Sequence, residues 1–330
     1  MTRHWPGFWA RHGLIARLLR PLEWLFCHVA ARRRRRLEPI ARPLSAPVVV
    51  VGNLAVGGTG KTPLVIWLVS AAAARGWRPG VVLRGYGGRA ADITPVTAES
   101  DPGQVGDEAV LIARRTGSPV MIGRDRAAAA EALIAGGGVD LVISDDGLQH
   151  YRLARDVEIV VVDARRGHGN ARCLPAGPLR EPLARLREVD DVIGQGGPVD
   201  GIGHCFALMA NELEPIGPTH AAPPVSGDRV HGVAGIGHPA RFFDTLRAMG
   251  FDVVAHAFDD HHRYRASDLR LADDAALIMT EKDAVKCRAI APPASWYLPV
   301  AARPDDASAA FLVRLLDRAQ QRFNDRQRMP

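Results

Sequence analysis

The 330-residue chain has few cysteines, and they are far apart. Cys27, Cys173, Cys205 and Cys287 never form a C-x-x-C pair, so the sequence indicates neither a zinc site nor a disulfide framework. With an ordinary apolar content of 47%, the chain is long enough to bury a core of its own without such staples. We therefore expect a globular protein of a reduced compartment.

Long uninterrupted apolar runs are also missing from the N-terminal region. Residues 1–36 place aromatic and aliphatic side chains at three- or four-residue steps, the spacing of one helix face. Arg17, Arg20 and Glu23 interrupt the only long apolar stretch, which argues against a membrane-spanning helix. No apolar core followed by a small-residue cleavage site is present, which argues against a signal peptide. Pro21 should kink or divide the helix.

Basic charge is concentrated in the same region. Residues 1–42 carry ten arginines and two glutamates, a net +8 in a chain whose total is +6, so the remainder sums to −2. A nucleic-acid enzyme would spread basic residues along its cleft, so we expect no nucleic-acid partner. We expect residues 1–36 to be helices in a membrane interface, with Arg32–Arg36 against anionic lipid. The alternative is a helix packed on the protein's own core.

Lysine is scarce, since only Lys61, Lys282 and Lys286 occur among 42 basic residues. Lys61 belongs to a glycine-rich run that follows an apolar, strand-like segment, 47–52, and precedes an apolar helix, 64–74. The run matches the phosphate-loop pattern G-x-x-x-x-G-K-[ST], except that alanine takes the first position. We predict an ATP site formed by Ala55, Val56, Gly57, Gly58, Thr59, Gly60, Lys61 and Thr62.

The residue types in this run suit a triphosphate. Gly57, Gly58 and Gly60 let backbone N–H groups turn toward phosphate oxygens, and the helix N-terminus adds its positive dipole. Lys61 can place an ammonium at the β- and γ-phosphates, and the Thr62 hydroxyl can ligate Mg²⁺. The alternative is a glycine-rich turn with a chance lysine.

Carboxylates follow further apolar segments. Asp145 and Asp146 end the expected strand 139–144, where a phosphate-loop enzyme holds Mg²⁺, although D-D-G is also a turn signal. Asp107 follows Gly106 and is either a general base for a hydroxyl or a helix N-cap. A cluster of two aspartates and two histidines at 259–262 suits metal binding, the orientation of a catalytic carboxylate, or a solvated turn.

Together these motifs resemble the tetraacyldisaccharide 4′-kinase family. The matching segments stand in the family's order at 51–63, 84–88, 105–108, 145–150, 174–182, 258–261 and 280–283. The resemblance implies a kinase that transfers the γ-phosphate of ATP, with Mg²⁺, to the 4′-hydroxyl of a tetraacyldisaccharide 1-phosphate, forming lipid IVA in lipid A biosynthesis. It also implies a peripheral protein on the cytoplasmic face of the bacterial inner membrane, with the lipid A disaccharide precursor as its partner.

The same resemblance assigns roles to residues. Asp107 is then the catalytic base, helped by His261, while Lys61 stabilises the transferred phosphoryl group; His262 directly follows His261 and competes for its role. The magnesium ligands implied are Thr62, Asp145, Asp146 and Glu181. The substrate contacts implied are Arg84, Gly85, Tyr86 and Arg180.

Alternating strands and helices predict an α/β fold, a phosphate-loop NTPase-like parallel sheet with helices on both faces. Its strands are expected at 47–52, 80–84, 118–122, 139–144 and 157–163. A proline-rich stretch, Pro215 to Pro224, reads as a linker to a smaller α/β domain with strands at 229–236, 251–258, 276–280 and 296–300. We divide the chain into N-terminal helices (1–36), a kinase domain (37–225) and the smaller domain (226–330). The final helix, 307–322, is free to pack back on the kinase domain.

Two other functions fit parts of this pattern. One is a kinase for a water-soluble small molecule, with purely structural N-terminal helices. The other is a nucleotide-switched protein recruited to membranes, which would hydrolyse nucleotide slowly and would survive loss of Asp107.

Overall fold

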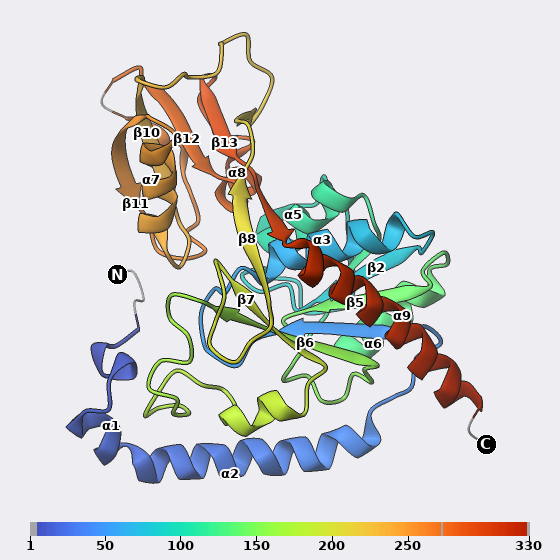
Figure 1. Cartoon of the computed structure of the whole chain (residues 1–330). Coiled ribbons are helices and arrows are strands. Elements are labelled where there is room, and N and C mark those ends of the chain that lie inside the picture. Colours follow the sequence, from blue (N-terminus) through green and yellow to red (C-terminus); the bar gives the residue numbers. More distant parts are fainter. Residues whose placement is uncertain (1–4, 272, 329–330) are drawn as a thin grey trace.

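The computed structural model describes residues 5–271 and 273–328, and it contains a large and a small β-sheet (Figure 1). In these residues the large sheet has the strand order β14-β8-β7-β6-β1-β5-β2-β4-β3. Every neighbouring pair is parallel except β14 with β8 and β3 with β4. The strands are β1 (Val48–Gly52), β2 (Pro79–Leu83), β3 (Thr94–Val96), β4 (Val120–Ile122), β5 (Leu141–Asp145), β6 (Val157–Asp163), β7 (Asp191–Gln195), β8 (His204–Ala210) and β14 (Val300–Pro304).

The small sheet has the order β11-β10-β12-β13-β9, with only β9 antiparallel to its neighbour in the described part of the chain. Helices α7 (Pro239–Ala248) and α8 (Glu281–Cys287) pack on it. Its strands are β9 (Glu214–Pro215), β10 (Arg229–Ala234), β11 (Asp252–Ala257), β12 (Ala276–Thr280) and β13 (Ser295–Leu298).

Helices cover both faces of the large sheet, and the alternation of side chains along β6 shows why. Ile159 and Val161 belong to the core formed with α3 (Lys61–Ala73), α5 (Asp107–Thr116) and α9 (Asp306–Arg328). Val160 and Val162 point to the opposite face, where the N-terminal segment packs. Successive residues of a strand face opposite ways, so an almost entirely apolar strand is buried on both sides. The part of the chain that forms the large sheet also contains α4 (Pro102–Val105) and α6 (Arg126–Ala135).

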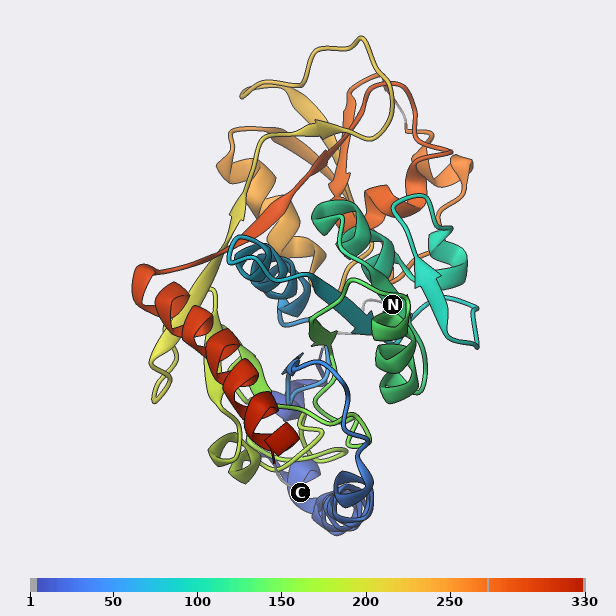
Figure 2. The same cartoon turned by 90° about the vertical axis from the view of Figure 1, so that its right-hand side faces the viewer.

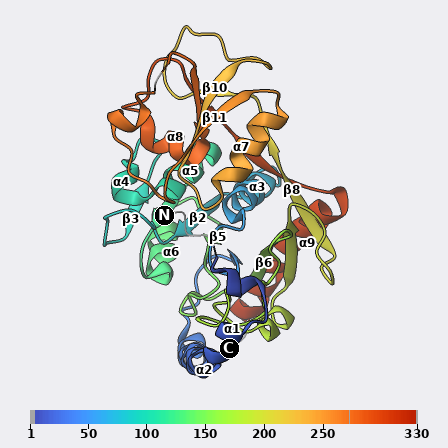
Figure 3. The ribbon, with the colours of Figure 1, turned by 90° about the vertical axis from the view of Figure 1, so that its left-hand side faces the viewer.

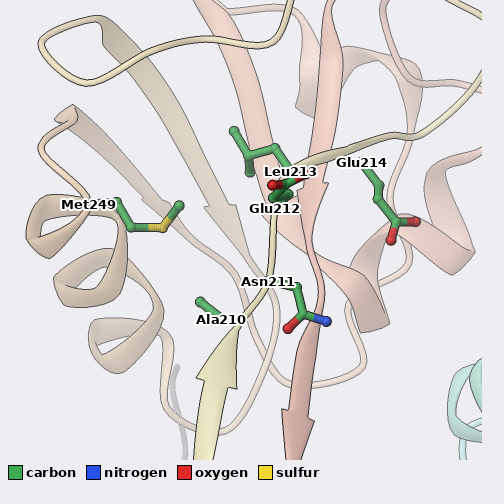
Figure 4. A pocket seen from close by; sticks show the side chains of 6 residues that line it. All are labelled: Ala210, Asn211, Glu212, Leu213, Glu214 and Met249. Carbon is green, nitrogen blue, oxygen red and sulfur yellow. The ribbon is translucent and has the colours of Figure 1, made fainter.

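Two chain crossings join the sheets. β8 and β14 leave the large sheet side by side (Figure 2), and the Asn211 amide donates to the Pro299 carbonyl at 2.9 Å beyond their ends. The strand expected over 296–300 is divided at Pro299, with β13 in the small sheet and β14 in the large one, since proline offers no N–H to a ladder. Figure 4 shows the shallow hollow beside this crossing, between Leu213 and Met249.

The N-terminal helices lie at the end of the molecule opposite the small sheet (Figure 3). As expected at Pro21, the helix is divided into α1 (Leu14–Leu18) and α2 (Arg20–Leu37), with the proline in the first turn of α2, where its missing N–H costs little. The C-terminal helix α9 packs on β1, β6, β8 and β14 of the large sheet.

Candidate active site

The glycine-rich run lies between β1 and α3, as the sequence predicts. Gly60 adopts a left-handed conformation (φ 73°) directly before Lys61, the first residue of α3, and glycine is suited to such a position because it has no Cβ. Asn53, which is 1% exposed, donates from its side-chain amide to the carbonyls of Ala55 (2.7 Å) and Gly57 (3.2 Å). The loop is therefore held from outside by a buried side chain.

Thr62 and Asp145 meet at the start of α3. The Thr62 hydroxyl and the Asp145 carboxylate are 3.0 Å apart. The second carboxylate oxygen of Asp145 is buried and has no hydrogen-bond partner among the described residues. Burial, followed by the negative charge of Glu108, raises the pKa of Asp145 above its usual range, against the opposing charge of Lys61. A cation at this oxygen would reverse that shift.

Asp146 faces a different set of groups. Its backbone has a positive φ of 50°, a conformation that aspartate tolerates better than most residues. Its carboxylate lies 3.3 Å from Lys61 and 3.2 Å from Arg180. Burial opposes ionisation, but these two cations and Arg126 hold the pKa of Asp146 below its usual range. Asp146 thus connects the phosphate-loop lysine to Arg180.

Glu181 is buried beside this group. Its carboxylate accepts from the Gln149 amide at 2.9 Å and lies 3.5 Å from Arg185. The Gln149 side-chain oxygen in turn accepts from Arg180 at 3.2 Å. These contacts are those of a group that supports Arg180, so the metal role expected for Glu181 stays a prediction.

The two sheets meet at Asp107 and His261. Asp107 is the first residue of α5, His261 follows β11, and their Oδ2 and Nδ1 atoms are 3.1 Å apart. Burial alone would raise the pKa of Asp107, but the His261 hydrogen bond and the charge of Lys282 outweigh it and lower that pKa to about 2. His261, like Asp146, has a positive φ (61°), and such strain is frequent at functional sites. His262 instead pairs with Asp268 at 3.1 Å.

All three lysines of the chain lie close to carboxylates in this region. Besides Lys61 at Asp146, Lys282 on α8 lies 3.1 Å from Glu108 and 3.4 Å from His261. Burial disfavours its charge, yet Glu108, Asp107 and Asp260 raise the pKa of Lys282 above its usual range. Lys286, one helical turn later, lies 3.7 Å from Asp107. Asp107 is therefore an ionised carboxylate close to two lysines of α8, a helix that packs on the small sheet.

The segment expected to contact the acceptor sugar borders His261. Tyr86 is 60% exposed, and the centroid of its ring lies 4.9 Å from that of His261. Gly106, with φ 92°, packs so closely on this segment that a Cβ would lie 2.6 Å from the Tyr86 carbonyl. A glycine is therefore required where the two loops cross. Arg84 and Gly85 line the cleft with Tyr86.

A single cleft of about 1870 Å³ joins these groups. The phosphate loop, Asp145, Arg180 and His261 all line it, and the small sheet supplies its other wall. Ligand sites in open α/β sheets lie beyond the carboxyl ends of the strands, and β1 and β5 end here. The cleft thus has the phosphate loop on one side. On the other, the acid–base side, it has His261 and Lys282, where we expect the acid–base chemistry.

The outer surface of α1 and α2 exposes leucine and tryptophan side chains, with Arg17 and Arg20 among them, along its first half and is arginine-rich along its second. Leu14 (72% exposed), Leu18 (71%) and Trp24 (69%) face outward, whereas Glu23 and Phe26 face the body. No helix among residues 5–271 and 273–328 is long and apolar enough to cross a membrane.

Comparison with known proteins agrees with the resemblance drawn from the motifs. A family model described as LpxK, tetraacyldisaccharide-1-P 4′-kinase, matches residues 15–319. The chain belongs to this family. A relative named tetraacyldisaccharide 4′-kinase from Alkalilimnicola ehrlichii is 54% identical over 322 residues, covering 95% of this chain and 97% of that protein. Another of the same name, from Azotobacter vinelandii, is 52% identical over 313 residues, or 91% and 93% of the two chains.

The fold is that of a solved family member. The crystal structure titled as the "apo" form of LpxK from Aquifex aeolicus in complex with ATP superposes with a TM-score of 0.77 at 24% identity. The superposition covers 93% of this chain and 99% of that one. The expected α/β architecture is therefore confirmed for this 4′-kinase family member.

Sequence reasoning missed several residues of the site. Arg126 is buried and donates to the Asp146 carbonyl at 2.6 Å, but one arginine among so many carries no signal. Gln149 was not singled out either. Lys282 did have a signal, namely the rarity of lysine, although that rarity does not reveal its partner Glu108.

Proposed function

We propose that this chain transfers the γ-phosphoryl group of ATP to the 4′-hydroxyl of a tetraacyldisaccharide 1-phosphate, forming lipid IVA in lipid A biosynthesis. Membership in the 4′-kinase family supports the substrates. The observation that carries the mechanism is the Asp107–His261 pair, 3.1 Å apart across two sheets, whose histidine lines the same cleft as the phosphate loop. A protein that only binds nucleotide would need the phosphate loop but would not need this acid–base pair.

ATP binds with its phosphates against residues 55–62. Backbone N–H groups of the loop and the Lys61 ammonium contact the phosphate oxygens. Asp146 lies between Lys61 and Arg180, so Arg180 is placed to stabilise the negative charge that develops on the γ-phosphoryl oxygens. Arg84, Gly85 and Tyr86 border the acceptor sugar on the other side of the cleft.

The residues at the start of α3 fit Mg²⁺. Thr62 and Asp145 offer a hydroxyl and a carboxylate, and the unpartnered oxygen of Asp145 is a free ligand position. No group of three or more His, Cys, Asp or Glu side chains in the described chain is arranged to hold a metal. Mg²⁺ needs none, because it keeps several waters and takes phosphate oxygens. When bound, the ion would neutralise charge between the β- and γ-phosphates; Asp146, already paired with two cations, is the less suited of the two aspartates.

The Asp107–His261 pair takes the proton of the attacking hydroxyl. A carboxylate whose pKa is about 2 is ionised at neutral pH but is a weak base on its own. The imidazole at 3.1 Å can share the proton, so we assign deprotonation to the pair rather than to Asp107 alone. Asp107 belongs to the part built on the large sheet, and His261 and Lys282 belong to the part built on the small one. Their contact here is that of a closed arrangement, and opening of the two parts would separate Asp107 from His261.

A lipid acceptor accounts for the N-terminal surface. Leu14, Leu18 and Trp24 would enter the interface of an anionic membrane, and the arginines at 32–36 would contact its headgroups. We place the protein peripherally on the cytoplasmic face of the inner membrane, where ATP is present. A kinase for a water-soluble acceptor would have no use for this face.

The test is transfer of label from [γ-³²P]ATP to tetraacyldisaccharide 1-phosphate in detergent micelles, with and without Mg²⁺. We expect labelled lipid with the wild type and at least a hundredfold less with Asp107→Asn. Failure of the wild type to label this lipid would overturn the proposal. Slow ATP hydrolysis that ignores the lipid and survives Asp107→Asn would favour the nucleotide-switched alternative.

A further inference from the structure

The first described residue of the chain touches the phosphate loop. The Trp5 indole N–H donates to the Val56 carbonyl at 3.0 Å, and residues Gly7–Ala10 then lead away to α1. A second tryptophan of the same segment, Trp9, donates to the Pro175 carbonyl at 3.0 Å. The segment that begins at Trp5 is thus bound to two loops of the body.

Trp5 also contacts a cation beside the loop. The Arg166 guanidinium lies over the indole ring, 4.9 Å from its centroid, and donates to the Gly58 carbonyl. Asp163, 2% exposed at the end of β6, holds Arg166 at 3.6 Å. The indole therefore limits where Arg166 can lie, as well as binding Val56 directly.

These contacts complete the outer support of the loop. The carbonyls of Ala55 and Gly57 accept from Asn53, that of Val56 from Trp5, and that of Gly58 from Arg166. In a trans peptide the carbonyl and the following N–H point in opposite directions. Four carbonyls held from outside leave the next N–H groups facing the cleft, except that of Val56, which binds the Pro178 carbonyl at 2.9 Å.

We propose that Trp5 is a positioning residue of the phosphate loop, which through Val56 and Arg166 holds the loop in the conformation that binds the triphosphate. The N-terminal segment then sets ATP affinity in addition to any contact with lipid. This inference rests on the proposed ATP site. It concerns ATP binding only, so replacing Trp5 should leave binding of the lipid acceptor unchanged.

The experiment measures ATP affinity of the full-length protein in detergent by calorimetric titration with a non-hydrolysable ATP analogue and Mg²⁺. Trp5→Phe removes the indole N–H and keeps a ring under Arg166, so we expect the dissociation constant to rise about three- to tenfold. Trp5→Ala removes both contacts and should raise it further. In steady state, KM for ATP should rise while KM for the lipid acceptor stays within twofold.

Two tryptophan variants serve as matched controls. Trp9→Phe releases the same segment from Pro175 while keeping a ring beside that of Trp5, and Trp24→Phe alters an exposed ring on α2. Both should keep wild-type ATP affinity. Equal affinity in Trp5→Phe and wild type, or an equal loss in Trp9→Phe, would overturn the positioning role. If the wild type itself bound no analogue, the proposed ATP site would fail instead.

Discussion

Asp107 Oδ2 and His261 Nδ1 lie 3.1 Å apart, although the two residues are 154 positions apart in the sequence. Asp107 begins a helix that packs on the large sheet, and His261 follows a strand of the small one. The pair therefore joins the part of the molecule built on the large sheet to the part built on the small one. It is also the candidate proton acceptor.

The first prediction concerns the coupling of this pair. Asp107→Asn and His261→Gln should each lower kcat about 10²- to 10⁴-fold, the usual contribution of a positioned base. The double variant should be little worse than the more damaged single variant, because groups that act as a unit are not additive. Steady-state assays with labelled ATP measure all four proteins. Losses that multiply would mean that the residues act separately.

The second prediction concerns stability and pH. The pKa of Asp107 is about 2 in the folded protein and about 3.9 unfolded, so the ionised group stabilises the fold above about pH 5 by about 2–3 kcal/mol. This contribution is lost as pH falls from about 4 toward 2. Urea unfolding of wild type and Asp107→Asn at pH 7, 5, 4 and 3.5 should show a difference that is flat at first and then shrinks. A difference that widens on acidification would contradict the assignment.

The third prediction concerns magnesium. Thr62→Ala removes the hydroxyl that meets Asp145 at 3.0 Å, so half-maximal activity should require at least tenfold more Mg²⁺, with activity partly recovered at high Mg²⁺. Activity titrated against MgCl₂ at fixed ATP measures this. Ser70→Ala, which removes a helix hydroxyl bonded to the Ile66 carbonyl, is the matched control. An unchanged Mg²⁺ requirement in Thr62→Ala would refute the ligand role.

The fourth prediction concerns Lys282. Lys282→Met should lower kcat about tenfold, because it leaves Glu108 without its cation and removes the ammonium group that lies 3.4 Å from His261, the partner of Asp107. KM for ATP should change little, since the lysine lies on the acid–base side of the cleft. Arg247→Met, which breaks an exposed pair with Asp244 on α7, should leave both constants unchanged. A raised KM for ATP with normal kcat would place Lys282 on the nucleotide side instead.

The fifth prediction concerns the N-terminal surface. Replacing Leu14, Leu18 and Leu25 together by serine should weaken binding to vesicles containing anionic phosphatidylglycerol at least tenfold, because each exposed leucine would otherwise bury its side chain in lipid. Co-sedimentation measures the bound fraction. Raised salt should weaken wild-type binding through the arginines.

The control for this surface uses equally exposed residues elsewhere. Ile40, Met209 and Val225 are 60%, 49% and 64% exposed and lie outside α1 and α2. Their triple serine variant should bind vesicles as the wild type does. Similar losses in both triple variants would show that general surface hydrophobicity, not the helical face, drives binding.

The sequence by itself determined those elements that depend only on residues close together in the chain. The loop at 55–62 needs glycine at φ values that other residues avoid. A strand buried on both faces needs apolar side chains throughout, so the expected bounds of β1, β5 and β6 lie close to the observed ones. The division of the N-terminal helix at Pro21 also follows from the missing proline N–H. The rarity of lysine pointed to three positions, all of which lie at carboxylates of the site.

Only the tertiary structure decided which of these residues meet. The separation of β13 from β14 across Pro299, which sends one strand to each sheet, depends on how the sheets are placed. That His261 rather than His262 meets Asp107 depends on the strained backbone of His261 between the two sheets. Trp5 at Val56, Arg126 at Asp146 and Glu108 at Lys282 are contacts across long stretches of chain. Sequence spacing carries no information on such contacts, because distance along a folded chain does not fix distance in space.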